Sequence, residues 1–134
     1  MRHFIAVAAL LLSALPVQAA RPLPQPKFLA VYFYADWCTN CKAFSPVLGE
    51  VRSDADLQKA PLLFVTLDLT DKPRIRQSLL LATALGIGGY VQSQGSATGY
   101  VALLDAASKK ELARFDRADT AATITQTIKA KLGD

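Results

Sequence analysis

The only two cysteines of the chain, Cys38 and Cys41, are the residues best suited to chemistry. They stand three apart, directly after the apolar, aromatic run Phe28–Tyr34. This order predicts a strand, a short turn and a helix, with both thiols on one face of the first helical turn and Cα atoms roughly 5–6 Å apart. Unpaired backbone N–H groups at a helix start stabilise a thiolate. The spacing therefore predicts a pair that cycles between dithiol and disulfide.

The N-terminus predicts a secretory signal peptide over residues 1–20. A short basic start precedes the apolar run Phe4–Leu15, and Pro16 is followed by small residues that suit a peptidase. The run is too short to span a bilayer comfortably, and an uncleaved anchor is the alternative. We expect cleavage after Ala19 or Ala20 and export to an oxidising compartment, most simply a bacterial periplasm, where disulfides persist.

Composition bounds the remaining possibilities. The 134 residues are 51% hydrophobic and 19% charged, which predicts one globular domain with a buried core. Cleavage would remove Arg2 and the only histidine, His3, leaving 14 basic and 11 acidic residues and a net charge of +3. We expect no nucleic acid partner, because this excess forms no dense basic patch. A Ser-His-Asp or Cys-His arrangement is also excluded.

A static cross-link and a metal site are the two other uses that a cysteine pair can have. A static cross-link is disfavoured, because closing so short a loop removes little conformational entropy from the unfolded chain. Two soft sulfurs suit Cu(I), but the mature chain would have no histidine or methionine. A copper site would need ligands from a partner or a second copy, and we predict no metal site within the chain.

The elements that must position the cysteines follow from apolar runs. Arg21–Lys27 has proline at every second position and predicts an extended linker ahead of a domain over residues 28–134. Phe28–Tyr34 and Pro61–Leu69 predict two parallel strands buried on both faces. The helix between them should begin near Trp37 and end in the mid-fifties, at the break Ser53-Asp54-Ala55-Asp56.

The rest of the chain predicts an α/β fold in which helices flank a central, mixed, four-stranded sheet, in the order β-α-β-α-β-β-α. After the second strand we expect a helix capped by Asp71 and ending near Leu85, a glycine-rich loop over Gly86–Gly95, a hairpin of Thr98–Leu104 and Lys110–Phe115, and a last helix from Asp119 or Thr120 to Leu132.

The segment Tyr34–Lys42 (YADWCTNCK), together with this order of elements, resembles the thioredoxin family. It is most similar to the periplasmic C-terminal domain of the transmembrane thiol:disulfide interchange reductase. Pro46, five residues after the second cysteine, matches the kinked helix of the family. The resemblance covers Phe28–Leu132 and implies a thioredoxin-like fold.

The resemblance also implies roles for individual residues. Cys38 would be the exposed nucleophile and Cys41 the buried resolving thiol, and Trp37 would shield the pair as a half-buried lid. Simple core packing is the alternative for Trp37. Lys42 would tune the field around the thiols or be a solvated helix residue. No dissociable cofactor is required.

In one respect the sequence departs from the family's pattern near the resolving thiol. Tyr32 stands where the family usually has a buried aspartate that accepts the proton of the second cysteine. A neutral phenol cannot accept a proton near pH 7. Asp36 is the only nearby carboxylate, and we expect it at the edge of the site.

A second departure concerns the strand that faces the disulfide, which the family opens with a cis-proline. No proline follows Pro73. The best register puts Ala97 at that position, followed by Thr98, and a shifted register would choose Val91. We expect a trans bond, because a cis non-proline bond costs about 2.5–4 kcal/mol. Gly86–Ser96 resembles an insertion that overhangs the site.

These observations favour an exported thiol-disulfide oxidoreductase that exchanges disulfides with envelope proteins. Thr39 and Asn40 place no cation between the cysteines, which favours a reductant or isomerase over a strong oxidant. A membrane thiol reductase would supply electrons, and we expect a monomer. The alternative is a thioredoxin-like binding module that delivers copper or holds a partner with little redox turnover.

Overall fold

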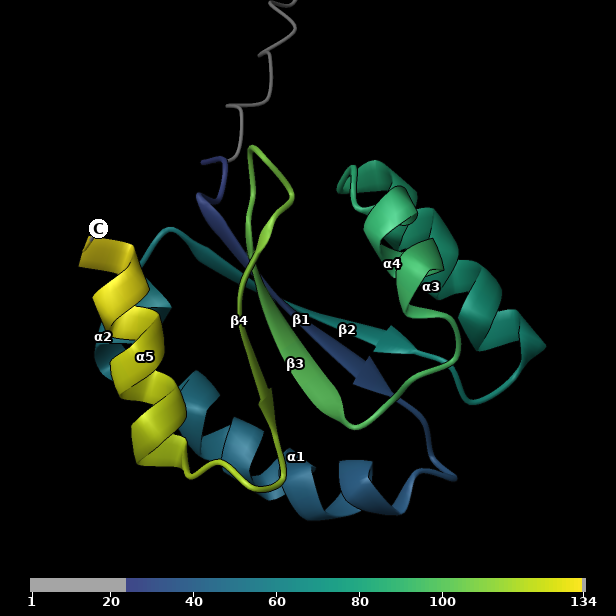
Figure 1. Cartoon of the computed structure of the whole chain (residues 1–134), viewed down its shortest axis with the longest axis horizontal. Helices are drawn as coiled ribbons and strands as arrows, with labels where there is room; N and C mark the ends of the chain where they lie inside the picture. The colour runs from purple at the N-terminus through teal and green to yellow at the C-terminus, as the bar shows by residue number, and fades with distance from the viewer. Residues whose placement is uncertain (1–23, 134) are drawn as a thin grey trace, which may run out of the picture.

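The computed structural model describes residues 24–133, so the expected leader lies outside the described residues. Helices cover both faces of one four-stranded sheet, whose strand order is β2-β1-β3-β4 (Figure 1). The elements in chain order are β1 (Phe28–Tyr34), α1 (Thr39–Ser53), α2 (Ala55–Lys59), β2 (Leu62–Asp68), α3 (Lys72–Ala84), α4 (Gly88–Gln94), β3 (Tyr100–Asp105), β4 (Glu111–Asp116) and α5 (Ala121–Gly133).

The central strand β1 matches its predicted bounds and is buried on both faces. It pairs in parallel with β2 and antiparallel with β3, so the expected mixed thioredoxin-like sheet is confirmed. Successive side chains of β1 point to opposite faces of the sheet and pack into two separate hydrophobic cores. Tyr32 packs with α1, α2 and α5, whereas Phe33 packs on the side of α3 and α4 (Figure 1). The cysteine pair follows directly from this strand.

The second strand is less buried than its apolar sequence predicts. It lies at the edge of the sheet, and Leu63 is 40% exposed on it. Before β1, residues 24–26 form no regular secondary structure. The N–H of Lys27 donates to the Pro61 carbonyl at 2.8 Å, so the end of the expected linker already joins the sheet.

Side-chain caps begin three of the described helices, α2, α3 and α5. The Asp71 carboxylate accepts the Arg74 N–H at 3.0 Å and starts α3, as expected. The Thr120 hydroxyl accepts the Thr123 N–H at 3.2 Å before α5. Asp54 was predicted to be part of a break. It does separate two helices, since α1 ends at Ser53, and its side chain caps the short helix α2, which was not predicted.

The prediction of a loop over Gly86–Gly95 is wrong, because α4 occupies most of that segment. Ile87 and Val91 stand four residues apart and are buried against the α3 side of the sheet. Their burial stabilises a short helix despite the glycines, whose low helix propensity suggested a loop. Within residues 24–133, no helix is long and apolar enough to span a membrane.

Candidate active site

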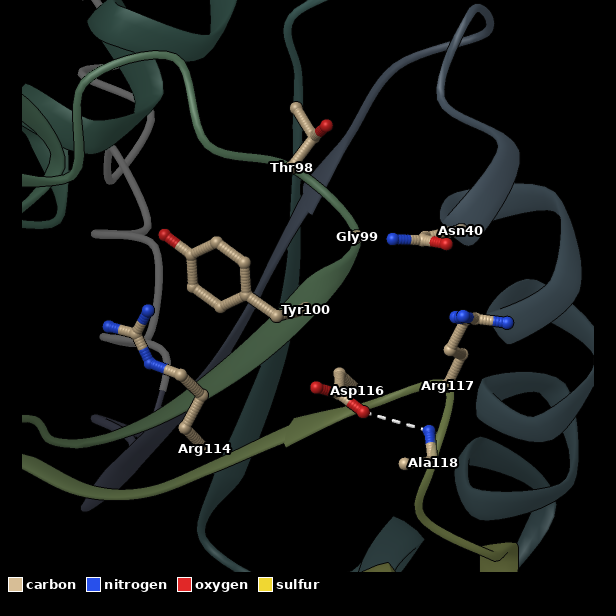
Figure 2. A pocket seen from close by; sticks show the side chains of 8 residues that line it. All are labelled: Asn40, Thr98, Gly99, Tyr100, Arg114, Asp116, Arg117 and Ala118. Atoms are coloured by element: carbon tan, nitrogen blue, oxygen red, sulfur yellow. Dashed lines mark hydrogen bonds between the residues drawn. The ribbon is translucent and has the colours of Figure 1, made fainter.

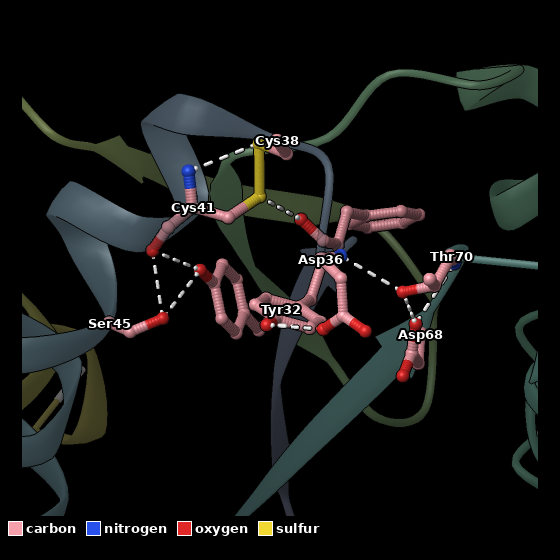
Figure 3. Close-up of a disulfide and its surroundings, with 9 residues drawn as sticks. Tyr32, Asp36, Cys38, Cys41, Ser45, Asp68 and Thr70 are labelled. Carbon is pink, nitrogen blue, oxygen red and sulfur yellow. Dashed lines mark hydrogen bonds between the residues drawn. A yellow bond between two sulfur atoms is a disulfide. The ribbon is translucent and has the colours of Figure 1, made fainter.

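The cysteines form a disulfide at the start of α1, with Cα atoms 5.2 Å apart (Figure 3). After β1 the chain turns, and the Cys38 N–H donates to the Ala35 carbonyl at 3.1 Å. Cys38 is the N-cap of α1, which begins at Thr39, two residues later than predicted. The expected strand, turn and helix start therefore hold the pair, and Pro46 lies inside the same helix.

The two sulfurs differ in access and in their contacts. Cys38 keeps 7% of its surface exposed, whereas Cys41 has none. Cys38 is thus less exposed than the family resemblance implied, although it is the more accessible of the two. Its Sγ accepts the Cys41 N–H at 3.1 Å, in the place where a helix N-terminus stabilises negative charge. This geometry suits Cys38 to ionise and attack first.

Gly99 faces the disulfide in the position that the sequence register assigned to Ala97. A Cβ on Gly99 would lie 3.4 Å from Cys38 Sγ and 3.0 Å from the Cβ of Asn40. Ala97 is exposed two residues earlier, and Thr98 directly precedes Gly99. Gly99 has φ of +89°, which L side chains rarely adopt. Glycine lets the backbone approach the sulfur here, where no proline is present.

An open cavity of about 590 Å³ lies beside this contact (Figure 2). Asn40, from the dipeptide between the cysteines, forms one wall, and the start of β3 and the end of β4 form the others. Gly99, which lies against Cys38 Sγ, and Asn40 therefore both line this cavity. The lining residues are Asn40, Thr98, Gly99, Tyr100, Arg114, Asp116, Arg117 and Ala118.

Tyr32 contacts the backbone of the resolving cysteine. Its buried hydroxyl donates to the Cys41 carbonyl at 3.1 Å, and the Ser45 hydroxyl donates to the same oxygen at 2.8 Å (Figure 3). Burial raises the pKa of Tyr32, so the phenol stays neutral, as the sequence predicted. Cys41 Sγ lies 3.8 Å from the Phe33 carbonyl oxygen. Tyr32 therefore holds the helix backbone and accepts no proton.

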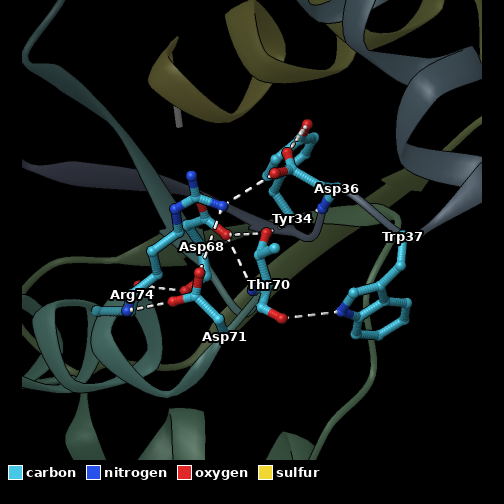
Figure 4. Close-up of polar contacts among 8 residues, drawn as sticks. Tyr34, Asp36, Trp37, Asp68, Thr70, Asp71 and Arg74 are labelled. Atoms are coloured by element: carbon cyan, nitrogen blue, oxygen red, sulfur yellow. Dashed lines mark hydrogen bonds and ion pairs between the residues drawn. The ribbon is translucent and has the colours of Figure 1, made fainter.

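Asp36 lies at the exposed edge of the site, as expected. Its carboxylate accepts a hydrogen bond from the Tyr34 hydroxyl at 2.8 Å and pairs with Arg74 Nη1 at 2.9 Å (Figure 4). The pKa of Asp36 is lowered, first by the Tyr34 hydroxyl and then by Arg74 and Lys42. Lys42 itself is exposed on α1.

Trp37 is not the half-buried lid that the sequence suggested, because its side chain is 59% exposed. The indole Nε1 donates to the Thr70 carbonyl at 3.2 Å, which directs the ring toward the loop between β2 and α3 (Figure 4). The ring borders a mainly apolar groove of about 360 Å³. The other residues of this groove are Leu69, Ile75, Leu79, Val91, Gln92, Gly95 and Ser96.

Gly95 and Ser96 belong to the segment that was expected to overhang the site, and they border Trp37. Sequence reasoning missed Gly99, Thr70 and Arg74. Only the parallel pairing of β1 and β2 could have indicated that the residues after β2 lie beside the cysteine turn. Among the described residues, no group of three or more His, Cys, Asp or Glu side chains could hold a metal ion.

Comparison with known proteins agrees with this architecture. Residues 21–82 match the model of the thioredoxin family. The structure of Trxlp from Edwardsiella tarda EIB202 shares 16% identity, covers 77% of this chain and 82% of its own, and has a TM-score of 0.50. The structure of MTB dsbF, in mixed oxidised and reduced forms, shares 17% identity, covers 79% and 81%, and has a TM-score of 0.51. These two structures show the fold. No curated protein matches the chain.

Proposed function

We propose that this chain is a member of the thioredoxin family and an exported thiol-disulfide oxidoreductase that exchanges disulfides with proteins of the cell envelope; the family match over residues 21–82 and the thioredoxin-like fold support this. The observation that carries the proposal is the asymmetry of the disulfide. Cys38 alone retains exposure, at a helix N-terminus and beside an open cavity, while Cys41 is sealed behind it. Such an arrangement assigns attack to Cys38 and resolution to Cys41.

The exchange proceeds from the reduced pair in two steps. The Cys38 thiolate attacks one sulfur of a client disulfide; a Cys38–client bond forms, and the other client sulfur leaves as a thiolate, which takes a proton from water. Cys41 then gives its proton to water and attacks Cys38 Sγ. The Cys38–Cys41 bond forms, and the second client sulfur leaves and is protonated. The client gains two electrons and two protons, and the pair becomes the disulfide of this structure.

We assign the protein to the reducing or isomerising side of envelope disulfide chemistry. Thr39 and Asn40 carry no charge that would stabilise a thiolate strongly, unlike the sites of strong oxidants. The likeness of Tyr34–Lys42 to the periplasmic domain of the transmembrane reductase supports the same direction. A membrane thiol reductase would return two electrons to the Cys38–Cys41 disulfide, and the protein would act as a monomer in the periplasm.

Insulin reduction with dithiothreitol tests the activity. The protein should accelerate precipitation of the insulin B chain, Cys38→Ser should abolish the acceleration, and Cys41→Ser should stop turnover after the mixed disulfide forms. Thr39→Ser, which changes neither sulfur, serves as the control. Acceleration that survives Cys38→Ser would refute the proposal. Stoichiometric Cu(I) binding with no effect on insulin would instead favour a copper-binding module.

A further inference from the structure

The turn before Cys38 is joined to the start of α3 by the ion pair between Asp36 and Arg74, a contact that the proposed exchange does not itself use (Figure 4). We infer that Arg74 is a positioning residue for this exchange: it draws the Asp36 carboxylate toward α3 and keeps that negative charge away from the Cys38 sulfur. The inference rests on the proposed function, since it concerns how the chain controls the reactivity of the same cysteine.

Asp36 is close enough to Cys38 in the chain for its charge to matter. The hydrogen bond from the Cys38 N–H to the Ala35 carbonyl makes Asp36 and Trp37 the central residues of a turn. The carboxylate thus stands two residues before the attacking sulfur. A negative charge near a thiol disfavours the thiolate, so an unrestrained Asp36 side chain would oppose ionisation of Cys38.

Arg74 and Tyr34 hold both oxygens of that carboxylate. Arg74 Nη1 lies 2.9 Å from Asp36 Oδ2, and the Tyr34 hydroxyl donates to Oδ1 at 2.8 Å. The guanidinium is itself placed by two further carboxylates, Asp68 and Asp71, each at 3.6 Å. Figure 4 shows Asp36 directed toward Arg74, with Trp37 leading away on the other side of the turn.

The turn has other anchors that do not depend on Arg74. The Asp36 N–H donates to Thr70 Oγ1 at 2.9 Å, and Trp37 Nε1 donates to the Thr70 carbonyl at 3.2 Å. The Thr70 N–H in turn donates to Asp68 Oδ1 at 2.9 Å. Loss of the guanidinium should therefore remove the positive charge at Asp36 Oδ2 and leave the side chain held by Tyr34 alone, while the backbone of the turn stays in place.

Polar or charged groups from four elements surround Asp36 or its partner Arg74, and one of these groups lies beside the cysteines. Tyr34 belongs to β1, Asp68 to β2, Arg74 to α3 and Lys42 to α1. Lys42, next to Cys41, is among the charges that lower the pKa of Asp36. Electrostatic interaction is mutual, so the field of Asp36 reaches the first turn of α1, where the sulfurs lie. Arg74 screens that field.

The test is the rate at which iodoacetamide alkylates Cys38 in the reduced protein, measured against pH, with the site of modification identified by mass spectrometry. Five variants are compared with the parent: Arg74→Gln, Arg74→Lys, Asp36→Asn, the double variant of Arg74→Gln and Asp36→Asn, and Arg76→Gln. Arg76 is the matched control, because it is exposed on the same helix and makes no ion pair among residues 24–133.

Arg74→Gln should slow alkylation near neutral pH about threefold, because the unneutralised carboxylate of Asp36 disfavours the Cys38 thiolate. Arg76→Gln should react like the parent, and Asp36→Asn should react as fast or faster. The double variant should return to the parental rate, because the charge that Arg74 restrains is gone. Arg74→Lys should restore part of the rate.

A double variant as slow as Arg74→Gln, or an Arg74→Gln rate equal to that of Arg76→Gln, would overturn the inference. Urea unfolding of each variant separates these outcomes from loss of the fold. The alkylation readout does not require turnover. A parent that fails to reduce insulin would therefore count against the proposed function and leave the role of Arg74 to be decided by the alkylation rates.

Discussion

Gly99 lies directly against Cys38: a Cβ at Gly99 would be 3.4 Å from Sγ and 3.0 Å from Asn40 Cβ. The Gly99 N–H also donates to the Phe33 carbonyl at 2.8 Å, and Cys41 Sγ approaches the same carbonyl. One short segment of backbone therefore shapes the surface beside the more accessible sulfur.

Gly99→Ala should reduce both stability and insulin reduction. Alanine is strained at φ of +89° by about 1–2 kcal/mol, and its methyl group would press on Asn40 beside the sulfur. Urea unfolding and the insulin assay measure the two effects. Gly49→Ala is the control, since Gly49 lies in α1 with nothing within 4 Å of its added Cβ. It should gain about 0.5–1 kcal/mol. Equal behaviour of the two variants would contradict the role of Gly99.

Tyr32→Phe should lower the free energy of unfolding by about 0.5–1.5 kcal/mol, the usual contribution of one hydrogen bond. The change removes the buried hydroxyl that donates to the Cys41 carbonyl, although Ser45 continues to bond that oxygen. Tyr34→Phe is the matched control. It removes an exposed hydroxyl and should cost less than about 0.5 kcal/mol. A Tyr32→Phe protein as stable as the parent would show that this contact does not hold α1.

Stability should fall as the pH drops below about 4. The pKa of Asp54 is lowered mainly by the Leu57 N–H, and that of Asp105 mainly by the Ser108 N–H. Their folded pKa values lie below the ordinary value of 3.8, so the unfolded chain takes up protons first as the pH falls. The stabilisation is present above that value and is lost as the pH falls through the lower folded pKa.

Urea unfolding between pH 6 and pH 2.5 measures this fall. Asp105→Asn keeps an oxygen for the Ser108 N–H but no longer titrates, so its stability should depend less on pH than that of the parent. Glu50→Gln removes an exposed carboxylate without a described side-chain contact and should keep the parental slope. Parallel curves for the parent and Asp105→Asn would disprove the contribution of Asp105.

The reduction potential should lie well below the about −120 mV of a strong periplasmic oxidant. Cys38 Sγ accepts one backbone N–H, and the Thr39-Asn40 dipeptide adds no cation, so its thiolate gains only moderate stabilisation. Equilibration with glutathione buffers, followed by alkylation and mass spectrometry, measures the potential. A value near that of a strong oxidant would contradict the assignment to reduction or isomerisation.

Local patterns were sufficient to predict the strand that precedes the cysteines and the starts of two later helices. Phe28–Tyr34 is apolar at nearly every position, which indicates a strand covered on both faces, and the caps at Asp71 and Thr120 mark helix starts. The helix α4 was not predicted, because its glycines indicate a loop and its stability depends on the burial of Ile87 and Val91 against a neighbouring layer. Such burial is a property of the assembled fold.

The surroundings of the disulfide were harder to predict, since they depend on segments far apart in the chain. No proline marks the strand that faces the sulfur, so the sequence comparison assigned Ala97, and not Gly99, to the position against the disulfide. The pairing of Arg74 with Asp36 requires β1 and β2 to end side by side, which no local pattern in the sequence indicates. The exposed ring of Trp37 likewise follows from its bond to Thr70.

The most direct test of the account is which sulfur attacks first. Each single variant, Cys38→Ser and Cys41→Ser, is incubated with oxidised glutathione, and the mixed disulfide is quantified by mass spectrometry. Since Cys38 is the more accessible sulfur and lies at the helix start, Cys41→Ser should rapidly accumulate a glutathione adduct on Cys38, whereas Cys38→Ser should remain almost unmodified. Equal or faster adduct formation on Cys41 would contradict the proposed mechanism.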